Sequence, residues 1–281
     1  MKTIIHATDY SENAVAALKY AYSISKKMNT SLLVVHVFDY PTVMTTKLKE
    51  PYYHIEKDTF KMHHSKLKDF CIKHLGNELD KMNVEVEAIE DKSVVNGIIS
   101  KVKEKNAFML VTGMKGASAF KELIMGNTAR HLIEKSPCPI LSIPADVSNR
   151  EIKTIVYATD FEKDDVKDIG KITEIARVYD AEIRVVHISP LKEYDRKKLM
   201  EDFKEKAKEK ISYKKMKFSI IPSDKTFEDL RLFLGEVNAD LIVMLERKSN
   251  GLIKKLFHRN LVKKMEVYGK IPLLSFKGIT E

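Results

Sequence analysis

Apolar and polar positions along this chain follow two patterns. Short runs that are apolar throughout predict strands buried on both faces, and the segments between them carry apolar residues at helical spacing on one face. In the first half, the expected strands are Thr3–Ala7, Leu32–Phe38, Val84–Ile89, Phe108–Thr112 and Ile140–Ile143, and the expected helices are Asn13–Met28, His54–Leu79, Ser93–Glu104 and Thr128–Glu134. Apolar strands joined by helices predict an α/β fold with a parallel sheet and helices on both faces.

The pattern occurs twice along the chain. Ile4–Asp9 (IIHATD) recurs as Ile155–Asp160 (IVYATD), and Val35–Val37 (VHV) recurs as Val186–Ile188 (VHI). A repeat of this length predicts two copies of one domain rather than a solenoid. We expect the first domain at residues 1–146 and the second at residues 151–281, with a polar stretch between them.

Glycines gather where the fourth expected strand ends. Gly113, Gly116 and Gly126 form the pattern Gly-x2-Gly-x9-Gly, and a helix is expected directly after it. Glycine allows a positive φ and the close approach of a ligand, and the free N–H groups at a helix start attract phosphate. Ligands of such sheets bind at the carboxyl ends of strands, and Asp9 and Val37 also lie near strand ends. We interpret the pattern as a phosphate cradle in a nucleotide-binding domain, with a loop that only turns the chain as the alternative.

At this point the chain resembles the universal stress protein family. The resemblance is carried by Ile4–Ser11, Val35–Val37, Thr112–Ser118 with Gly126, and Ser136–Leu141, and it covers nearly all of both copies. It implies two tandem Rossmann-like domains of the adenine nucleotide alpha hydrolase-like type, each with a five-stranded parallel sheet. It also implies a cytoplasmic, regulatory protein of the stress response that binds ATP or a related adenine nucleotide, alone or with Mg²⁺.

The resemblance also assigns roles to residues of the first copy. Asp9 would accept hydrogen bonds from ribose hydroxyls, although a helix N-cap role is equally open. Ala7 and Thr8 would line the base pocket, and the backbone of Val37 would meet the adenine edge. The full candidate nucleotide site is Ala7, Thr8, Asp9, Val37, Thr112, Gly113, Met114, Gly116, Gly126, Asn127, Thr128 and Ala129.

Two positions depart from the family's pattern. The family's nucleotide binders usually carry Ser or Thr where this chain has Asn127, and they often carry a further hydroxyl residue where it has Ala129. Asparagine can still donate a hydrogen bond to phosphate, and backbone N–H groups do not depend on side chains. Nucleotide binding therefore stays the expectation.

The second copy keeps Asp160 but loses the glycine pattern. Leu245–Gly251 stands in place of the loop, and His258–Asn260 stands where Gly126–Asn127 would fall. Bulky side chains there would block the approach of backbone to phosphate, so we expect one nucleotide per chain, in the first copy only. The basic residues of this stretch could bind an anion through their side chains, but such a run is more often solvated or packed on a partner.

Composition and charge narrow the function classes. No apolar run approaches the roughly 20 residues that a membrane span needs, the N-terminus does not have the pattern of a signal peptide, and two cysteines fit a reducing cytoplasm. The net charge is +9. The lysines of residues 191–217 alternate with acidic residues, and few aromatic residues lie among them. This pattern favours a solvated helix over a nucleic-acid surface. His63 and His64 are adjacent and cannot share a helical face, so we expect no metal site.

Catalytic signals are weak. The chain lacks a P-loop and a Gly-x-Ser-x-Gly elbow, so we assign no catalytic residue and expect slow ATP hydrolysis at most. An ATP-hydrolysing or nucleotidyl-transferring enzyme of the same fold, and a partner-docking module, remain as alternatives. The closing strands Ile140–Ile143 and Leu273–Phe276 would expose unpaired backbone at a sheet edge, which favours an intramolecular pseudo-dimer. A homodimer and the identity of a protein partner stay open.

Overall fold

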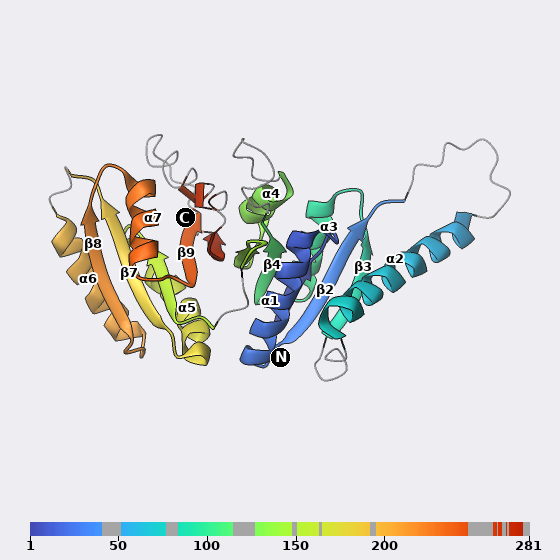
Figure 1. Cartoon of the computed structure of the whole chain (residues 1–281), viewed down its shortest axis with the longest axis horizontal. Coiled ribbons are helices and arrows are strands. Elements are labelled where there is room, and N and C mark those ends of the chain that lie inside the picture. Colours follow the sequence, from blue (N-terminus) through green and yellow to red (C-terminus); the bar gives the residue numbers. More distant parts are fainter. Residues whose placement is uncertain are drawn as a thin grey trace. The chain divides into compact units, whose positions relative to one another are not determined.

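The computed structural model describes residues 1–40, 52–76, 84–114, 127–147, 151–162, 165–191, 195–246, 261–262, 264–265, 268 and 270–277. These residues form two compact units, of which the first ends at Ala145 and the second begins at Asp146. Each unit is an α/β domain built on a parallel sheet (Figure 1). The predicted fold class is therefore confirmed.

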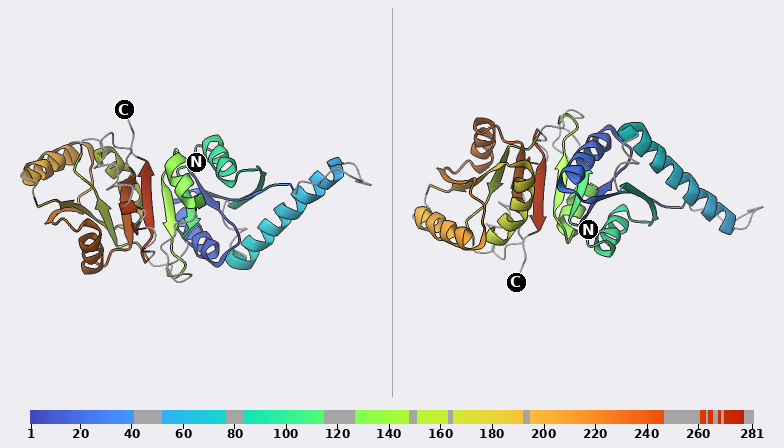
Figure 2. Two further views of the ribbon diagram at one scale, coloured as in Figure 1. Left: turned by 90° about the horizontal axis from the view of Figure 1, so that it is seen from above. Right: turned by 90° about the horizontal axis from the view of Figure 1, so that it is seen from below.

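The first unit has the strand order β3-β2-β1-β4-β5, and its strand pairs are parallel. Helices α1 and α2 lie on one face of this sheet and α3 lies on the other (Figure 2), where α4 contacts α3. The elements are β1 (Thr3–Ala7), α1 (Glu12–Met28), β2 (Ser31–Phe38), α2 (Tyr52–Leu75), β3 (Val84–Glu90), α3 (Val94–Glu104), β4 (Met109–Gly113), α4 (Asn127–Lys135) and β5 (Ile140–Ile143).

The second unit repeats this topology with the order β10-β9-β6-β7-β8, again with parallel pairs. Helices α5 and α6 lie on one face and α7 on the other (Figure 2). The elements are β6 (Thr154–Ala158), α5 (Asp165–Tyr179), β7 (Glu182–Ser189), α6 (Arg196–Lys210), β8 (Met216–Pro222), α7 (Thr226–Glu236), β9 (Leu241–Glu246) and β10 (Leu273–Lys277). The two predicted copies thus have one topology, and the predicted pseudo-dimer arrangement stays a prediction.

Helix α1 shows how local sequence sets the bounds of an element. Ser11 is its N-cap, since the Ser11 hydroxyl accepts a hydrogen bond from the Ala14 N–H at 3.3 Å. Asn29 ends the helix in the left-handed conformation, with φ 51°. Between these ends, small buried residues such as Ala17 and Ala21 let the helix lie close to the sheet.

Helix α2 ends earlier than the predicted Leu79. It runs to Leu75, and Gly76 follows with a φ of 64°, which is a common way for a helix to end. No helix within the described ranges is both long and apolar enough to cross a membrane.

Candidate functional site

The carboxyl ends of β1, β2 and β4 meet where the strand order of the first unit reverses. Parallel α/β sheets bind ligands at such a point. The register pairs His6 with Val111 and Ala7 with Val35. Because side chains alternate between the two faces, Ala7 and Thr112 lie on one face together with Val37.

Helix α3 covers this face. A Cβ atom on Gly97 of α3 would lie 3.1 Å from Val37 Cγ1, so the helix and the strand are in close contact there. The Val37 side chain is 8% exposed. The structure therefore brings together three of the predicted site residues, Ala7, Val37 and Thr112.

Thr112 carries a polar atom that the protein does not satisfy. The side chain is 7% exposed, and its hydroxyl has no hydrogen-bond partner among the described residues. A buried hydroxyl without a partner costs about 1–3 kcal/mol. A bound ligand or water would remove this cost at the switch point of the sheet.

The turn after β1 is held by its own threonine. Thr8 donates its backbone N–H to the Val35 carbonyl at 3.0 Å, and the Thr8 hydroxyl accepts the N–H of Tyr10 at 3.0 Å. Tyr10 has a φ of 65°, in the left-handed region that few residues other than glycine adopt. The hydroxyl of Thr8 thus maintains the turn that carries Asp9.

Asp9 is exposed and supports the start of α1. Its Oδ1 accepts hydrogen bonds from the Ser11 hydroxyl at 2.5 Å and from the Ser11 N–H at 3.0 Å. Ser11 in turn is the N-cap of α1. The N-cap role that the sequence left open for Asp9 therefore belongs to Ser11, and Asp9 orients that cap while its carboxylate faces solvent.

Gly113 has a packing role that the sequence did not reveal. Among the described glycines only Gly76 has a positive φ, so the positive φ expected at Gly113 is absent. A Cβ there would lie 2.7 Å from the carbonyl carbon and oxygen of Asn13 and 3.0 Å from the Ala14 nitrogen. Glycine is needed because β4 packs directly on the backbone at the start of α1.

The remaining candidate residues lie within or on either side of residues 115–126, which are outside the described ranges. Met114 is 1% exposed and donates its N–H to the Ile143 carbonyl at 2.7 Å, so it belongs to the core. Thr128 and Ala129 lie in the first turn of α4, where Thr128 is exposed. Asn127 begins that helix, and Gly116 and Gly126 lie outside the described residues.

His36 of β2 supports the turn from behind. Its Nδ1 lies 2.9 Å from the Thr8 carbonyl oxygen, and its ring centroid lies 4.4 Å from that of Tyr10. Burial lowers the pKa of His36 below 6.5, against the raising effect of the Thr8 carbonyl. The repetition of this histidine in the second copy, as His187, was the sequence signal of a shared structural role.

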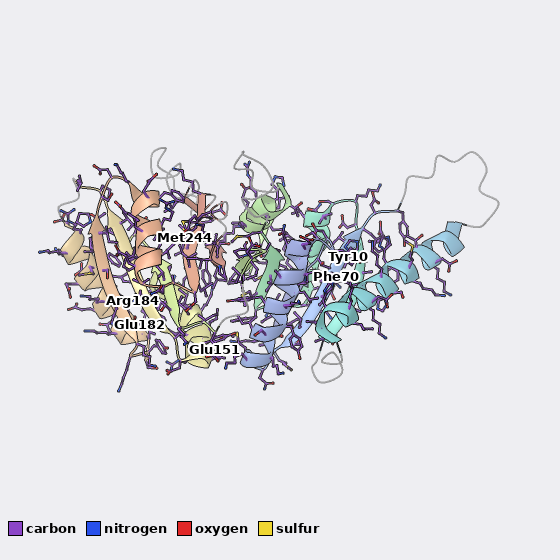
Figure 3. The ribbon with its side chains drawn as sticks, viewed as in Figure 1. Tyr10, Phe70, Glu151, Glu182, Arg184 and Met244 are labelled. Atoms are coloured by element: carbon purple, nitrogen blue, oxygen red, sulfur yellow. The ribbon has the colours of Figure 1, made fainter. Side chains whose placement is uncertain are left out.

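Helix α2 packs against Tyr10 and against Phe38 of β2. Phe70 lies 5.3 Å from Tyr10 between ring centroids (Figure 3), and Lys66 Nζ lies 4.5 Å from the centre of the Tyr10 ring. His63 stacks on Phe38 at 4.1 Å. Burial raises the pKa of Tyr10 to about 12, so its phenol stays neutral.

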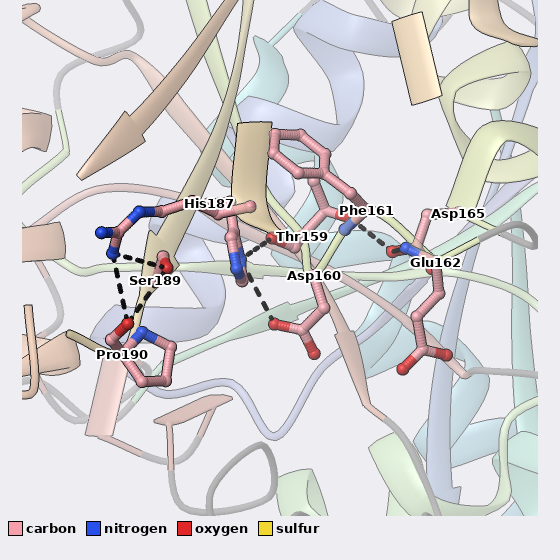
Figure 4. A network of polar contacts seen from close by, with 9 residues as sticks. Thr159, Asp160, Phe161, Glu162, Asp165, His187, Ser189 and Pro190 are labelled. Carbon is pink, nitrogen blue, oxygen red and sulfur yellow. Dashed lines mark hydrogen bonds and ion pairs between the residues drawn. The ribbon is translucent and has the colours of Figure 1, made fainter. Parts of the chain in front are cut away.

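The second unit builds the same turn after β6 (Figure 4). Thr159 donates its N–H to the Val186 carbonyl at 3.0 Å, and its hydroxyl accepts the Phe161 N–H at 3.0 Å. Phe161 has a φ of 59°, and His187 Nδ1 lies 3.0 Å from the Thr159 carbonyl oxygen. The backbone of the turn and its supporting histidine are therefore duplicated.

What surrounds this second turn is different. Asp160 Oδ1 lies 3.6 Å from His187 Nδ1, whereas Asp9 contacts Ser11. Asp165 is fully buried, and its Oδ2 accepts the Thr159 hydroxyl and the Glu162 N–H (Figure 4). The carboxylates of Asp160 and Asp165 thus close this turn on itself.

The strand that faces this turn has also changed. The register that pairs Ala158 with Met244 puts Leu245 at the place of Gly113, and Leu245 is buried. Residues 247–260, which include the predicted basic replacement of the glycine loop, lie outside the described residues. Within the part of the chain that the structure describes, no three His, Cys, Asp or Glu side chains are grouped so that they could hold a metal ion.

Comparison with known proteins gives consistent results. The model of the universal stress protein family matches residues 1–144. The Universal stress protein YxiE of Bacillus subtilis (strain 168) is 26% identical over 141 residues, which are 49% of this chain and 95% of that protein.

Solved structures also resemble the whole chain. A universal stress protein from Archaeoglobus fulgidus DSM 4304 matches with a TM-score of 0.67 and 19% identity, over 98% of both chains. A functionally unknown protein from Pseudomonas aeruginosa PAO1 matches with a TM-score of 0.57 and 13% identity, over 99% of this chain and 92% of that one. At these identities the two structures show a common fold.

Proposed function

The chain belongs to the universal stress protein family, and from this premise we propose that its first unit binds ATP or a related adenine nucleotide. The bound nucleotide would bias the shape or the contacts of a cytoplasmic, regulatory protein of the stress response. Mg²⁺ would arrive with the phosphates of the nucleotide. We assign no catalytic residue.

One observation carries this proposal. Thr112 presents a buried hydroxyl without a partner among the described residues, at the switch point of the sheet and on the same face as Ala7 and Val37. A ligand with hydrogen-bonding groups and a flat apolar ring fits such a surface, since polar atoms orient a ligand that apolar walls bury.

The exposed carboxylate of Asp9 lies at the neighbouring strand end and is available to ribose hydroxyls. The first turn of α4, with Thr128 and Ala129, offers backbone N–H groups to an anion. Gly116, Gly126 and Asn127 complete the proposed phosphate site, and their part in it rests on the sequence.

The second unit lacks these features. Leu245 is buried at the position of Gly113, and Asp160 lies beside His187. We therefore propose one nucleotide per chain and a scaffolding role for the second unit, which completes the pseudo-dimer and carries a surface for a protein partner.

Titration calorimetry of the full-length chain with ATP tests the proposal. We expect a stoichiometry near one, and mass spectrometry of ligand released from the purified protein should detect an adenine nucleotide. Asp9→Ala should weaken binding about tenfold, the worth of one hydrogen bond to a charged group. The matched variant Asp160→Ala should leave binding unchanged.

Thr112→Val provides a sharper variant because it removes the hydroxyl and keeps the shape of the side chain. We expect about fivefold weaker ATP binding with no loss of folding stability, since the hydroxyl has no partner among the described residues. A stoichiometry near two, or unchanged ATP affinity in both the Asp9 and the Thr112 variants, would refute the proposed site.

A further inference from the structure

The two units hold the same turn with its aspartate in two different positions. In the first unit Asp9 points to Ser11, with its Oδ1 at 2.5 Å from the Ser11 hydroxyl, which we call the outward position. In the second unit Asp160 Oδ1 lies 3.6 Å from His187 Nδ1, which we call the inward position. Glu162 replaces Ser11 in the second unit and offers no hydroxyl.

The histidine behind the turn is the same in both units. His36 Nδ1 lies 2.9 Å from the Thr8 carbonyl and His187 Nδ1 lies 3.0 Å from the Thr159 carbonyl. Because a carbonyl oxygen only accepts, Nδ1 carries the proton in the neutral ring and Nε2 carries the lone pair. A second proton would leave the hydrogen bond to Thr8 intact and place a full positive charge behind Asp9.

We propose that His36 is a positioning residue of the nucleotide site: its hydrogen bond to Thr8 holds the turn, and its protonation draws Asp9 from the outward to the inward position. Nucleotide binding therefore weakens as the pH falls, because the inward carboxylate is lost to the ribose. This inference rests on the proposed function, and the position of Asp160 shows that the backbone of the turn accommodates the inward arrangement.

The charged groups around His36 set where this change occurs. Burial lowers the pKa of His36 below its ordinary value of 6.5 and Lys66 of α2 lowers it further, while the Thr8 carbonyl and Asp9 raise it. His63 of α2 stacks at 5.6 Å from His36 between ring centroids, and its own pKa is lowered by burial and by His36.

Two further titratable groups near the turn keep their protonation state over the pH range in which His36 changes. Burial lowers the pKa of His6 to about 4 and raises that of Tyr10 to about 12. At pH 7 His36 is thus neutral and Asp9 is outward, and the change takes place below pH 6.5.

The test compares ATP affinity at about pH 7.5 and at the lower pH at which the His36 ring is protonated, in the wild-type chain and in His36→Asn. The asparagine amide nitrogen reaches the place of Nδ1 and donates to Thr8, but it does not titrate. We expect wild-type binding to weaken about fivefold more than that of the variant over this range, the scale of an exposed ion pair. The comparison cancels the titration of the ATP phosphates, because the wild type and the variant bind the same nucleotide.

Two further variants separate positioning from charge. His36→Phe keeps a ring against Tyr10 but loses the donor, and we expect it to bind ATP about tenfold more weakly throughout the pH range. His187→Asn, the matched change in the second unit, should follow the wild-type curve. Equal pH dependence of the wild type and His36→Asn would overturn the inference.

Carboxyl-carbon NMR of the ligand-free, full-length chain gives an independent measurement. The Asp9 signal should show an inflection that coincides with the titration of His36 and disappears in His36→Asn. Failure to bind ATP at pH 7.5 would refute the proposed function alone. Absence of this inflection would refute the movement of Asp9.

Discussion

The turns after β1 and β6 have one backbone and two chemical environments. In both, a threonine hydroxyl and a histidine hold the turn, and an aromatic residue adopts the left-handed backbone conformation. The hydrogen-bond distances around Thr8 and Thr159 match. The first turn leaves its aspartate exposed, and the neighbouring strand β4 carries the buried Thr112 hydroxyl, which has no hydrogen-bond partner among the described residues. The second turns its carboxylates inward, onto its own threonine and histidine.

This difference shows how a duplicated domain can change the chemistry at its strand ends and keep its fold. The turn is held by hydrogen bonds of its threonine and of a histidine on the next strand, and both copies retain them. Three of the positions that differ lie on strands and helices next to the turn: Gly113 against Leu245, His6 against Tyr157, and Ala14 against Asp165. Each pair yields a substitution that tests the comparison.

The largest effect is expected from Gly113→Val. The new side chain would collide with the Asn13 backbone, 2.7 Å from the position of Cβ, and overpacking against backbone costs about 3 kcal/mol or more. Gly170→Ala in α5, which meets nothing within 4 Å, should be neutral or stabilising by about 0.5–1 kcal/mol.

Urea unfolding combined with hydrogen exchange of the full-length chain would locate the loss in the first unit. Undiminished stability of Gly113→Val would contradict the packing role of this glycine. Sequence reasoning alone leads to the opposite expectation, that a substitution here removes the ligand and leaves the fold intact, so this experiment separates the two roles.

His6 should make the first unit the more acid-sensitive one. Its pKa is lowered from 6.5 to about 4 by burial, so the unfolded state takes up a proton first. The stability that the neutral ring supports is complete above pH 6.5 and is lost as the pH falls toward 4, by about 2–3 kcal/mol.

His6→Val should remove most of this pH dependence, measured as the free energy of unfolding at about pH 7 and about pH 4.5. The second unit, with Tyr157 at the same position, should show no corresponding loss from this site. If the slopes of wild type and variant agree, His6 is not the group responsible.

Asp165→Ala should destabilise the second unit by about 2 kcal/mol. It leaves the Thr159 hydroxyl and the Glu162 N–H without their buried acceptor. Hydrogen exchange should report faster opening around α5 with the first unit unchanged. An equal effect in both units would mean that the inward carboxylates do not define the second turn.

Asp9→Ala should have the smallest effect on stability, about 1 kcal/mol or less. The exposed carboxylate only orients the Ser11 cap, and the loss of a cap typically costs that much. A stability loss as large as that of Asp165→Ala would place Asp9 among the structural residues and remove the contrast between the two turns.

Much of the fold could be predicted from the sequence. The strands Thr3–Ala7 and Ile140–Ile143 were predicted at their observed bounds, because buried strands have a local apolar pattern. Helix α2 was placed less well, since its end is determined by Gly76 and not by periodicity. Of the candidate site residues, Ala7, Val37 and Thr112 lie on one face of the sheet, and their role in binding stays a prediction.

The sequence by itself determined the α/β class, the duplication and the strand ends at which a ligand would bind, because these follow from spacing along the chain. Only the tertiary structure decided what the residues there do. Gly113 proved to be a contact with α1, Met114 a core residue and His36 the support of a turn. The physical reason is that each of these roles depends on a neighbour from a distant element, and no local pattern records which atoms that neighbour presents.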